Sequence, residues 1–98
     1  MDNWLEVIDK IKYFREYPVY EYEDEERPSE EVVIEACKMA LTLSEGPPPM
    51  RVVPCGDNGI AFEWKSGDIY ETISIMNDEV EHIIFKDCKI VDRYQIKI

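Results

Sequence analysis

Three consecutive prolines, Pro47-Pro48-Pro49, divide this chain into two parts with different hydrophobic periods. Proline has no backbone amide and a fixed φ, so a helix does not continue through such a run. Before the prolines, apolar residues recur every three or four positions, which indicates amphipathic helices. From Met50 onward they alternate in short runs, which indicates strands. This division predicts an α+β domain in which helices precede the sheet.

The first part of the chain predicts a helix over residues 3–17. Asn3 is a suitable N-cap residue, and Glu6 three positions later completes a pattern similar to a capping box. Pro18 removes the amide that the next turn would need, so the helix is expected to end near Tyr17. The expected apolar stripe comprises Trp4, Ile8, Ile11 and Arg15, with Leu5, Val7 and Lys12 beside it.

A second helix is expected between Ser29 and Gly46. Ser29 is a favourable N-cap, and Glu30 and Glu31 then lie in the first turn, where carboxylates interact well with the helix dipole. Gly46 suits the left-handed conformation that follows many helices, and the prolines prevent continuation. The expected buried stripe comprises Val33, Ala36, Cys37, Ala40 and Leu41.

The second part of the chain predicts five short strands separated by turn-forming residues. Their expected ranges are 51–54, 60–64, 69–76, 80–85 and 90–98. The connections are too short to hold crossover helices, so the strands must form an antiparallel meander of four or five strands. The first connection contains Asp57-Asn58-Gly59, which predicts a primed hairpin turn with positive φ rather than half of a calcium loop.

Alternation within the strands separates the two faces of this sheet. The apolar face is expected to carry Ile60, Phe62, Trp64, Ile69, Ile73, Ile75, Ile90, Tyr94, Ile96 and Ile98, and both helices should pack on it. The opposite face is expected to carry Glu63, Thr72, Ser74, Arg93, Gln95 and Lys97, exposed to solvent or to a partner. The 98 residues are expected to form one domain, 1–98, with an acidic connecting segment at 18–28.

Part of the chain resembles a family of small, uncharacterised bacterial and phage proteins. The resemblance covers residues 28–75. It is carried by the helix start Pro28-Ser29-Glu30-Glu31 and by a hairpin similar to D-G-G-I-x-x-E-W, here Asp57-Asn58-Gly59-Ile60-x-Phe62-Glu63-Trp64. This chain has Asn58 where the pattern has glycine. The resemblance implies a fold, and because the family has no established activity it implies no functional residues.

The strongest functional signal is a run of acidic residues. Between Glu16 and Glu35 the chain has nine carboxylates and one cation, Arg27, and the whole molecule has a net charge of −11. Such a surface repels nucleic acid, anionic lipid and phosphorylated metabolites, and its natural counterpart is a basic protein surface. Two interpretations stay open: a solvated loop that keeps the protein soluble, or a surface that binds a cationic groove.

The second interpretation gives the predicted function. Spaced carboxylates imitate the charge of a nucleic-acid backbone, and tyrosines supply rigid contact area. The chain is therefore expected to be a non-catalytic inhibitor or mask of a nucleic-acid-handling protein, of the anti-CRISPR, anti-restriction or antitoxin-like kind, and not to bind nucleic acid itself. The predicted partner-binding residues are Tyr17, Tyr20, Glu21, Tyr22, Glu23, Asp24, Glu25, Glu26, Glu30 and Glu31.

Two alternatives belong to other functional classes. One is a homo-oligomeric accessory module, such as a homodimer, that associates through a sheet edge or the second sheet face. The other is a small-molecule-binding domain with a pocket between helix and sheet, near Trp64 and Tyr70.

No catalytic or metal-binding set is recognisable in the sequence. Cys37, Cys55 and Cys88 are far apart and form no CxxC pair, which indicates reduced thiols in a cytoplasmic protein. The single histidine, His82, lies in an apolar run and is expected to be structural or superficial, on the same face as Ile84. We expect neither an enzyme nor a protein with a cofactor, a metal or a membrane-spanning segment.

Overall fold

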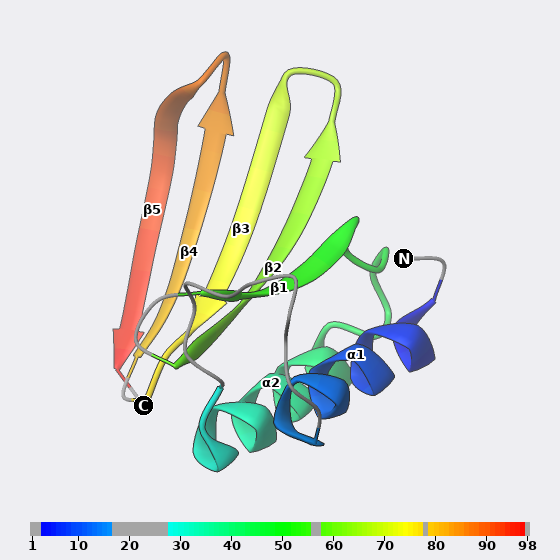
Figure 1. Cartoon of the computed structure of the whole chain (residues 1–98). Coiled ribbons are helices and arrows are strands. Elements are labelled where there is room, and N and C mark those ends of the chain that lie inside the picture. Colours follow the sequence, from blue (N-terminus) through cyan, green and yellow to red (C-terminus); the bar gives the residue numbers. More distant parts are fainter. Residues whose placement is uncertain (1–2, 17–27, 56–57, 78, 98) are drawn as a thin grey trace.

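The computed structural model describes residues 3–16, 28–55, 58–77 and 79–97 (Figure 1). The helices are α1 (Trp4–Glu16) and α2 (Glu30–Thr42). The strands are β1 (Arg51–Cys55), β2 (Gly59–Ser66), β3 (Ile69–Ile75), β4 (Glu79–Lys86) and β5 (Lys89–Lys97). All neighbouring strands pair antiparallel in the order β1-β2-β3-β4-β5. The expected α+β architecture, two helices on a meander sheet, is confirmed.

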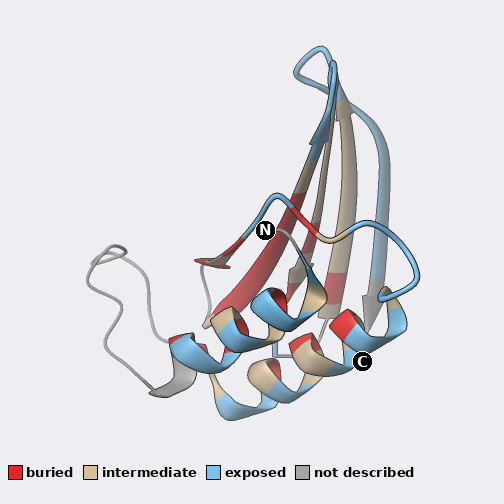
Figure 2. Ribbon diagram, turned by 90° about the vertical axis from the view of Figure 1, so that its right-hand side faces the viewer, coloured by how far each residue is buried: buried red, intermediate tan, exposed pale blue. Residues whose placement is uncertain are grey.

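The two helices pack side by side on one face of the sheet. α1 contacts β1, and α2 contacts β2 and β3. The end of α1 and the start of α2 lie at the same end of the helical layer (Figure 1). In Figure 2 the buried positions lie where the helices and the sheet face each other. Residues 89–95 of β5, in contrast, are all exposed.

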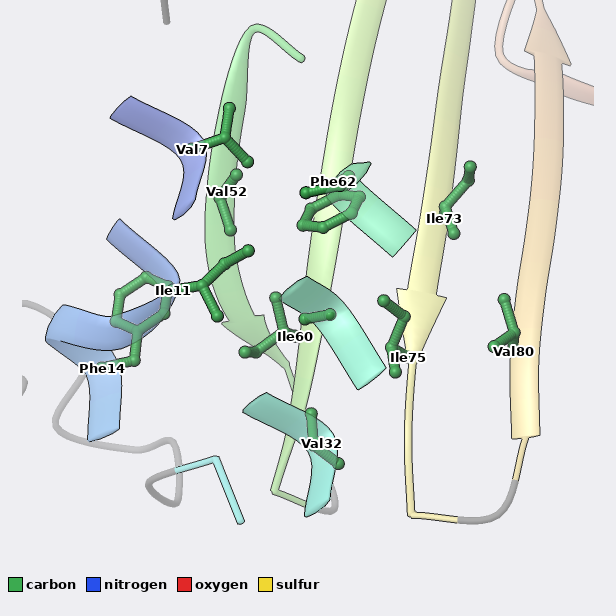
Figure 3. Packing of buried hydrophobic residues seen from close by; sticks show 12 residues of the cluster. Val7, Ile11, Phe14, Val32, Val52, Ile60, Phe62, Ile73, Ile75 and Val80 are labelled. Atoms are coloured by element: carbon green, nitrogen blue, oxygen red, sulfur yellow. The ribbon is translucent and has the colours of Figure 1, made fainter. Parts of the chain in front are cut away.

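The core joins both helices to the first four strands. α1 contributes Val7, Ile11 and Phe14, each with no exposed surface. The other members include Val32, Ala36 and Ala40 of α2 and Val52, Ile60, Phe62, Ile73, Ile75 and Val80 of the sheet (Figure 3). Within each helix the buried residues are three or four positions apart, so one of them lies on every turn.

Two helical residues expected in or beside the buried stripes are exposed instead. Leu5 is 74% exposed and Leu41 is 66% exposed. In α1 the buried stripe runs through Val7, Ile11 and Phe14, which turns Leu5 away from the sheet. The prediction of which apolar residues face the core was therefore wrong at these two positions.

The N-terminal caps of both helices are confirmed. The Asn3 side chain accepts a hydrogen bond from the backbone N–H of Glu6 at 2.9 Å. Ser29 Oγ accepts from the N–H of Val32 at 3.2 Å and donates to Oδ1 of Asn77 at 2.8 Å. The second bond ties the start of α2 to the connection between β3 and β4.

Gly46 does not adopt the left-handed conformation expected of it. α2 ends at Thr42 with Leu43 as its C-cap, and the N–H of Leu43 donates to carbonyls of the last turn. Gly46 lies farther along, where its N–H donates to the Leu43 carbonyl at 2.9 Å. Gly67, at the tight turn between β2 and β3, is the glycine with positive φ (60°) among the described residues.

The connection between β1 and β2 also differs from the expected turn. Asn58 has the left-handed φ, 60°, while Gly59 already belongs to β2 and pairs with Cys55. A Cβ on Gly59 would lie 2.8 Å from both Cys55 Sγ and the Ile75 carbonyl oxygen. Glycine is required there because neighbouring atoms approach closely, whereas Asn58 supplies the positive φ.

A β-bulge changes the face of one predicted residue. The register between β4 and β5 shifts near Ile84 and Phe85, so Ile90 pairs with Phe85 on the outer face of the sheet. Ile90 therefore does not share a face with Tyr94, which pairs with His82 on the helix-facing side. The register confirms the residues expected on the outer face, but Glu63 among them is only 8% exposed.

Candidate functional site

Most of the predicted partner-binding surface lies outside the described residues. This applies to Tyr17, Tyr20, Glu21, Tyr22, Glu23, Asp24, Glu25 and Glu26. The structure describes Glu30 and Glu31, which occupy the first turn of α2 and are exposed. Their carboxylates lie beside the positive end of the helix dipole, which is favourable.

A cleft of about 830 Å³ lies on the helix-facing side of the sheet. Its walls are the C-terminal part of α2, the link at 46–50 and strands β2, β3 and β4. Apolar side chains dominate the walls, among them Met39, Leu43, Trp64, Ile73 and Val80. The volume lies in the range of small-molecule sites.

Two indole groups fix the link that forms one wall of this cleft. Trp4 Nε1 donates to the Gly46 carbonyl at 2.9 Å, and Trp64 Nε1 donates to the Pro47 carbonyl at 3.1 Å. The proline run that follows has restricted φ angles. The wall is thus formed without a ligand and loses little conformational freedom when one binds.

The polar end of the cleft carries a hydrogen-bonded carboxylate and imidazole from two neighbouring strands. Glu71 Oε1 and His82 Nε2 lie 2.7 Å apart, and the two side chains are 36% and 31% exposed. The His82 ring also lies 5.7 Å from the ring of Tyr94, whose hydroxyl donates to Asp92 at 2.8 Å. His82 shares its face with Ile84, as expected, and the pairing with Glu71 was not predicted.

Tyr70 does not belong to this cleft. The predicted pocket placed it near Trp64, but Tyr70 pairs with Lys65 and Phe85 on the outer face. There its ring lies 5.8 Å from that of Phe85. The pKa of the Tyr70 hydroxyl is raised, mainly by burial and to a lesser extent by a hydrogen bond to Glu63. Trp64 lines the cleft, so the prediction was right for one residue and wrong for the other.

The outer face carries two further charged groups. Arg51 donates from Nε to the buried Glu63 carboxylate of the neighbouring strand. Glu81 Oε2 accepts from Arg93 at 2.7 Å and from Gln95 at 2.8 Å. The Arg93 hydrogen bond lowers the pKa of Glu81, against a smaller opposing effect of burial. These contacts link adjacent strands, and they pair the charged side chains with one another within the sheet.

The cysteines show no reactive arrangement in the part of the chain that is described. Burial raises the pKa of the Cys37 thiol, partly offset by Lys12, so its thiolate is disfavoured. Cys88 is exposed in the β4–β5 turn, where Asp87 and Cys88 both have positive φ. Among the described residues, no cluster of three or more His, Cys, Asp or Glu side chains is placed to hold a metal ion.

Comparisons of the chain with protein-family models, with curated proteins and with solved structures find no match. The resemblance to the family of small bacterial and phage proteins stays a prediction. Neither described helix has the length and the apolar character needed to cross a membrane.

Proposed function

We propose that this protein is a non-catalytic acidic interaction protein that binds, and inhibits or masks, a basic surface on a nucleic-acid-handling protein. The observation that carries the proposal is the charge of one segment: nine carboxylates against one cation between Glu16 and Glu35. Such a concentration of one sign steers an oppositely charged partner and favours the correct orientation.

The arrangement of the helices supports a concentrated surface. The segment leaves the end of α1 and returns at the start of α2, and these two points lie at the same end of the helical layer (Figure 1). Glu30 and Glu31 are exposed at that end. These two carboxylates act together on a partner that approaches within about one Debye length, roughly 8 Å at physiological ionic strength.

The test compares two variants of equal charge. In the first, Glu23, Asp24, Glu25 and Glu26 become amides. In the matched control, Glu45→Gln, Asp68→Asn, Glu79→Gln and Asp87→Asn remove the same charge from other parts of the chain. Wild type and both variants are immobilised separately, and each is used at low salt to capture proteins from a lysate of the source cells. The proposal expects that wild type and the control capture a nucleic-acid-handling protein and that the first variant does not.

A specific observation favours homo-oligomerisation as the second candidate function. β5 is an edge of the sheet, and it exposes Ile90, Val91 and Tyr94 by 53%, 58% and 49%. Unpaired edge strands are ready to pair with another chain, although lysines at such edges oppose this, and Lys89 begins β5. A mass that rises with concentration in sedimentation, equally in wild type and in the acidic-segment variant, would favour this candidate.

A further inference from the structure

The cleft beside α2 has a second distinctive feature besides its volume: an aromatic ring and a carboxylate side by side. Trp64 and Glu71 are directly opposite each other on β2 and β3, and both line the cleft. Side chains in such cross-strand pairs begin about 5 Å apart on one face of the sheet. A group bound to the Glu71 carboxylate therefore lies within reach of the Trp64 indole.

The Glu71 carboxylate is held in place on its strand. Its Oε1 contacts His82 Nε2 at 2.7 Å, and the His82 ring packs near Tyr94. A carboxylate has two acceptor oxygens, and the contact with His82 uses one of them. With a side chain 36% exposed, Glu71 remains accessible from the cleft.

Of the two charged residues that line the cleft in the described part of the chain, Glu71 lies on the helix-facing side of the sheet and Lys65 on the outer side by register. Glu71, His82 and Lys65 are the ionisable residues that line it in the described structure. Lys65 is exposed, and its register partner Tyr70 lies on the outer face, so solvent screens its ammonium group.

We propose that this cleft binds a small organic ammonium ion with an apolar body. The ammonium group would donate to Glu71 and lie against the Trp64 indole, where a cation–π interaction adds to the ion pair. The apolar body would occupy the space between Met39, Leu43 and Ile73. This site lies at the opposite end of α2 from Glu30 and Glu31, so it does not depend on the proposed binding of a basic protein.

The test uses three probes that share a phenylethyl body and differ in charge. Phenethylamine is the cation, hydrocinnamate the anion and phenethyl alcohol the neutral control. Each is titrated into the full-length protein while the indole N–H signals of Trp4 and Trp64 are followed by NMR. The proposal expects a saturable shift of the Trp64 signal with the amine, weaker binding of the alcohol, and the weakest binding of the anion.

Two variants then separate a specific site from general attraction. Glu71→Gln should weaken amine binding by about tenfold or more, the usual effect of losing a hydrogen bond to a charged group. Glu30→Gln removes the same charge at a distant exposed position and should leave the affinity within about twofold, as expected of a screened surface charge. Both spectra also show whether the variant is folded.

The proposal is overturned by any of three results. The first is that phenethylamine produces no saturable shift of the Trp64 signal. The second is that hydrocinnamate binds as tightly as the amine in wild type, a comparison that needs no variant. The third is that folded Glu71→Gln binds the amine as wild type does.

Discussion

Glu71 and His82 are diagonal neighbours on β3 and β4, and their side chains meet at 2.7 Å between Oε1 and Nε2. Their direct cross-strand partners are different residues, Ile84 for Glu71 and Ile73 for His82. The pair therefore places two polar groups among apolar neighbours on the helix-facing side. The helical layer leaves these groups half-exposed, which makes this the chemically distinctive part of the cleft.

Core stability should depend on Phe14 and not on Leu5. Phe14→Ala removes a fully buried ring and leaves a cavity, so the free energy of unfolding should fall by about 3–5 kcal/mol. Leu5→Ala changes a side chain that is 74% exposed and should alter it by no more than about 0.5 kcal/mol. Urea unfolding followed by circular dichroism measures both. Equal losses would show that α1 packs differently.

Substitution by alanine should affect the stability differently at Gly59 and at Gly46. Gly59→Ala places Cβ 2.8 Å from Cys55 Sγ and the Ile75 carbonyl, so it should destabilise the protein by about 1–3 kcal/mol. In Gly46→Ala the nearest atom, the Leu43 carbonyl oxygen, is 3.5 Å away. That change should be neutral or stabilise by up to about 1 kcal/mol, because alanine restricts the unfolded chain. Thermal unfolding distinguishes the two, and a tolerated Gly59→Ala would contradict the close approach.

Ser29 should contribute more to the stability than an N-cap alone, because its hydroxyl joins the start of α2 to the connection between β3 and β4. Ser29→Ala removes the acceptor for the Val32 N–H and the donor to Asn77, so unfolding should become easier by about 0.5–2 kcal/mol. Ser29→Thr keeps the hydroxyl and should retain most of the stability. Ser44→Ala, at the other end of α2, loses an exposed bond to the Leu41 carbonyl and serves as the control. A loss in Ser44→Ala as large as in Ser29→Ala would argue against the cap.

The contribution of Glu81 to stability should depend on pH in a defined direction. Hydrogen bonds from Arg93 and Gln95 lower the pKa of Glu81, so ionised Glu81 is favoured in the folded state. This contribution is present above the ordinary glutamate range and is lost as the pH falls through the lowered value. Arg93→Gln should raise the pKa of Glu81 in an NMR titration of its side chain. Lys38→Gln, which removes the partner of Glu35, should leave it unchanged, and an unchanged value in Arg93→Gln would refute the assignment.

The architecture was predictable because local signals determine the connectivity. The proline run and short turns admit helices first and then a meander, and the structure has both. The cap residues Asn3 and Ser29 act through hydrogen bonds to nearby amides, so sequence spacing alone identified them.

What the sequence could not predict depends on exact register and on contacts between distant segments. The bulge near Ile84 moves Ile90 to the other face, and alternation alone carries no signal for it. The pairing of Glu71 with His82 needs the register of the β3–β4 hairpin. The cleft needs the path of the link at 46–50, which bonds to Trp4 and Trp64 far from it in sequence. The short connections of the β2–β3 and β3–β4 hairpins were the one sequence signal from which the closeness of Trp64, Glu71 and His82 could have been inferred.

The most direct test of the proposed function is the association rate of the purified protein with its captured partner, measured as a function of ionic strength. Electrostatic steering predicts a rate that falls steeply from low to high salt in wild type and in the control with Glu45, Asp68, Glu79 and Asp87 converted to amides. The variant with Glu23, Asp24, Glu25 and Glu26 as amides should bind slowly and with little dependence on salt. A wild-type rate that does not change with salt, or an acidic-segment variant that associates as fast as wild type, would contradict the proposal.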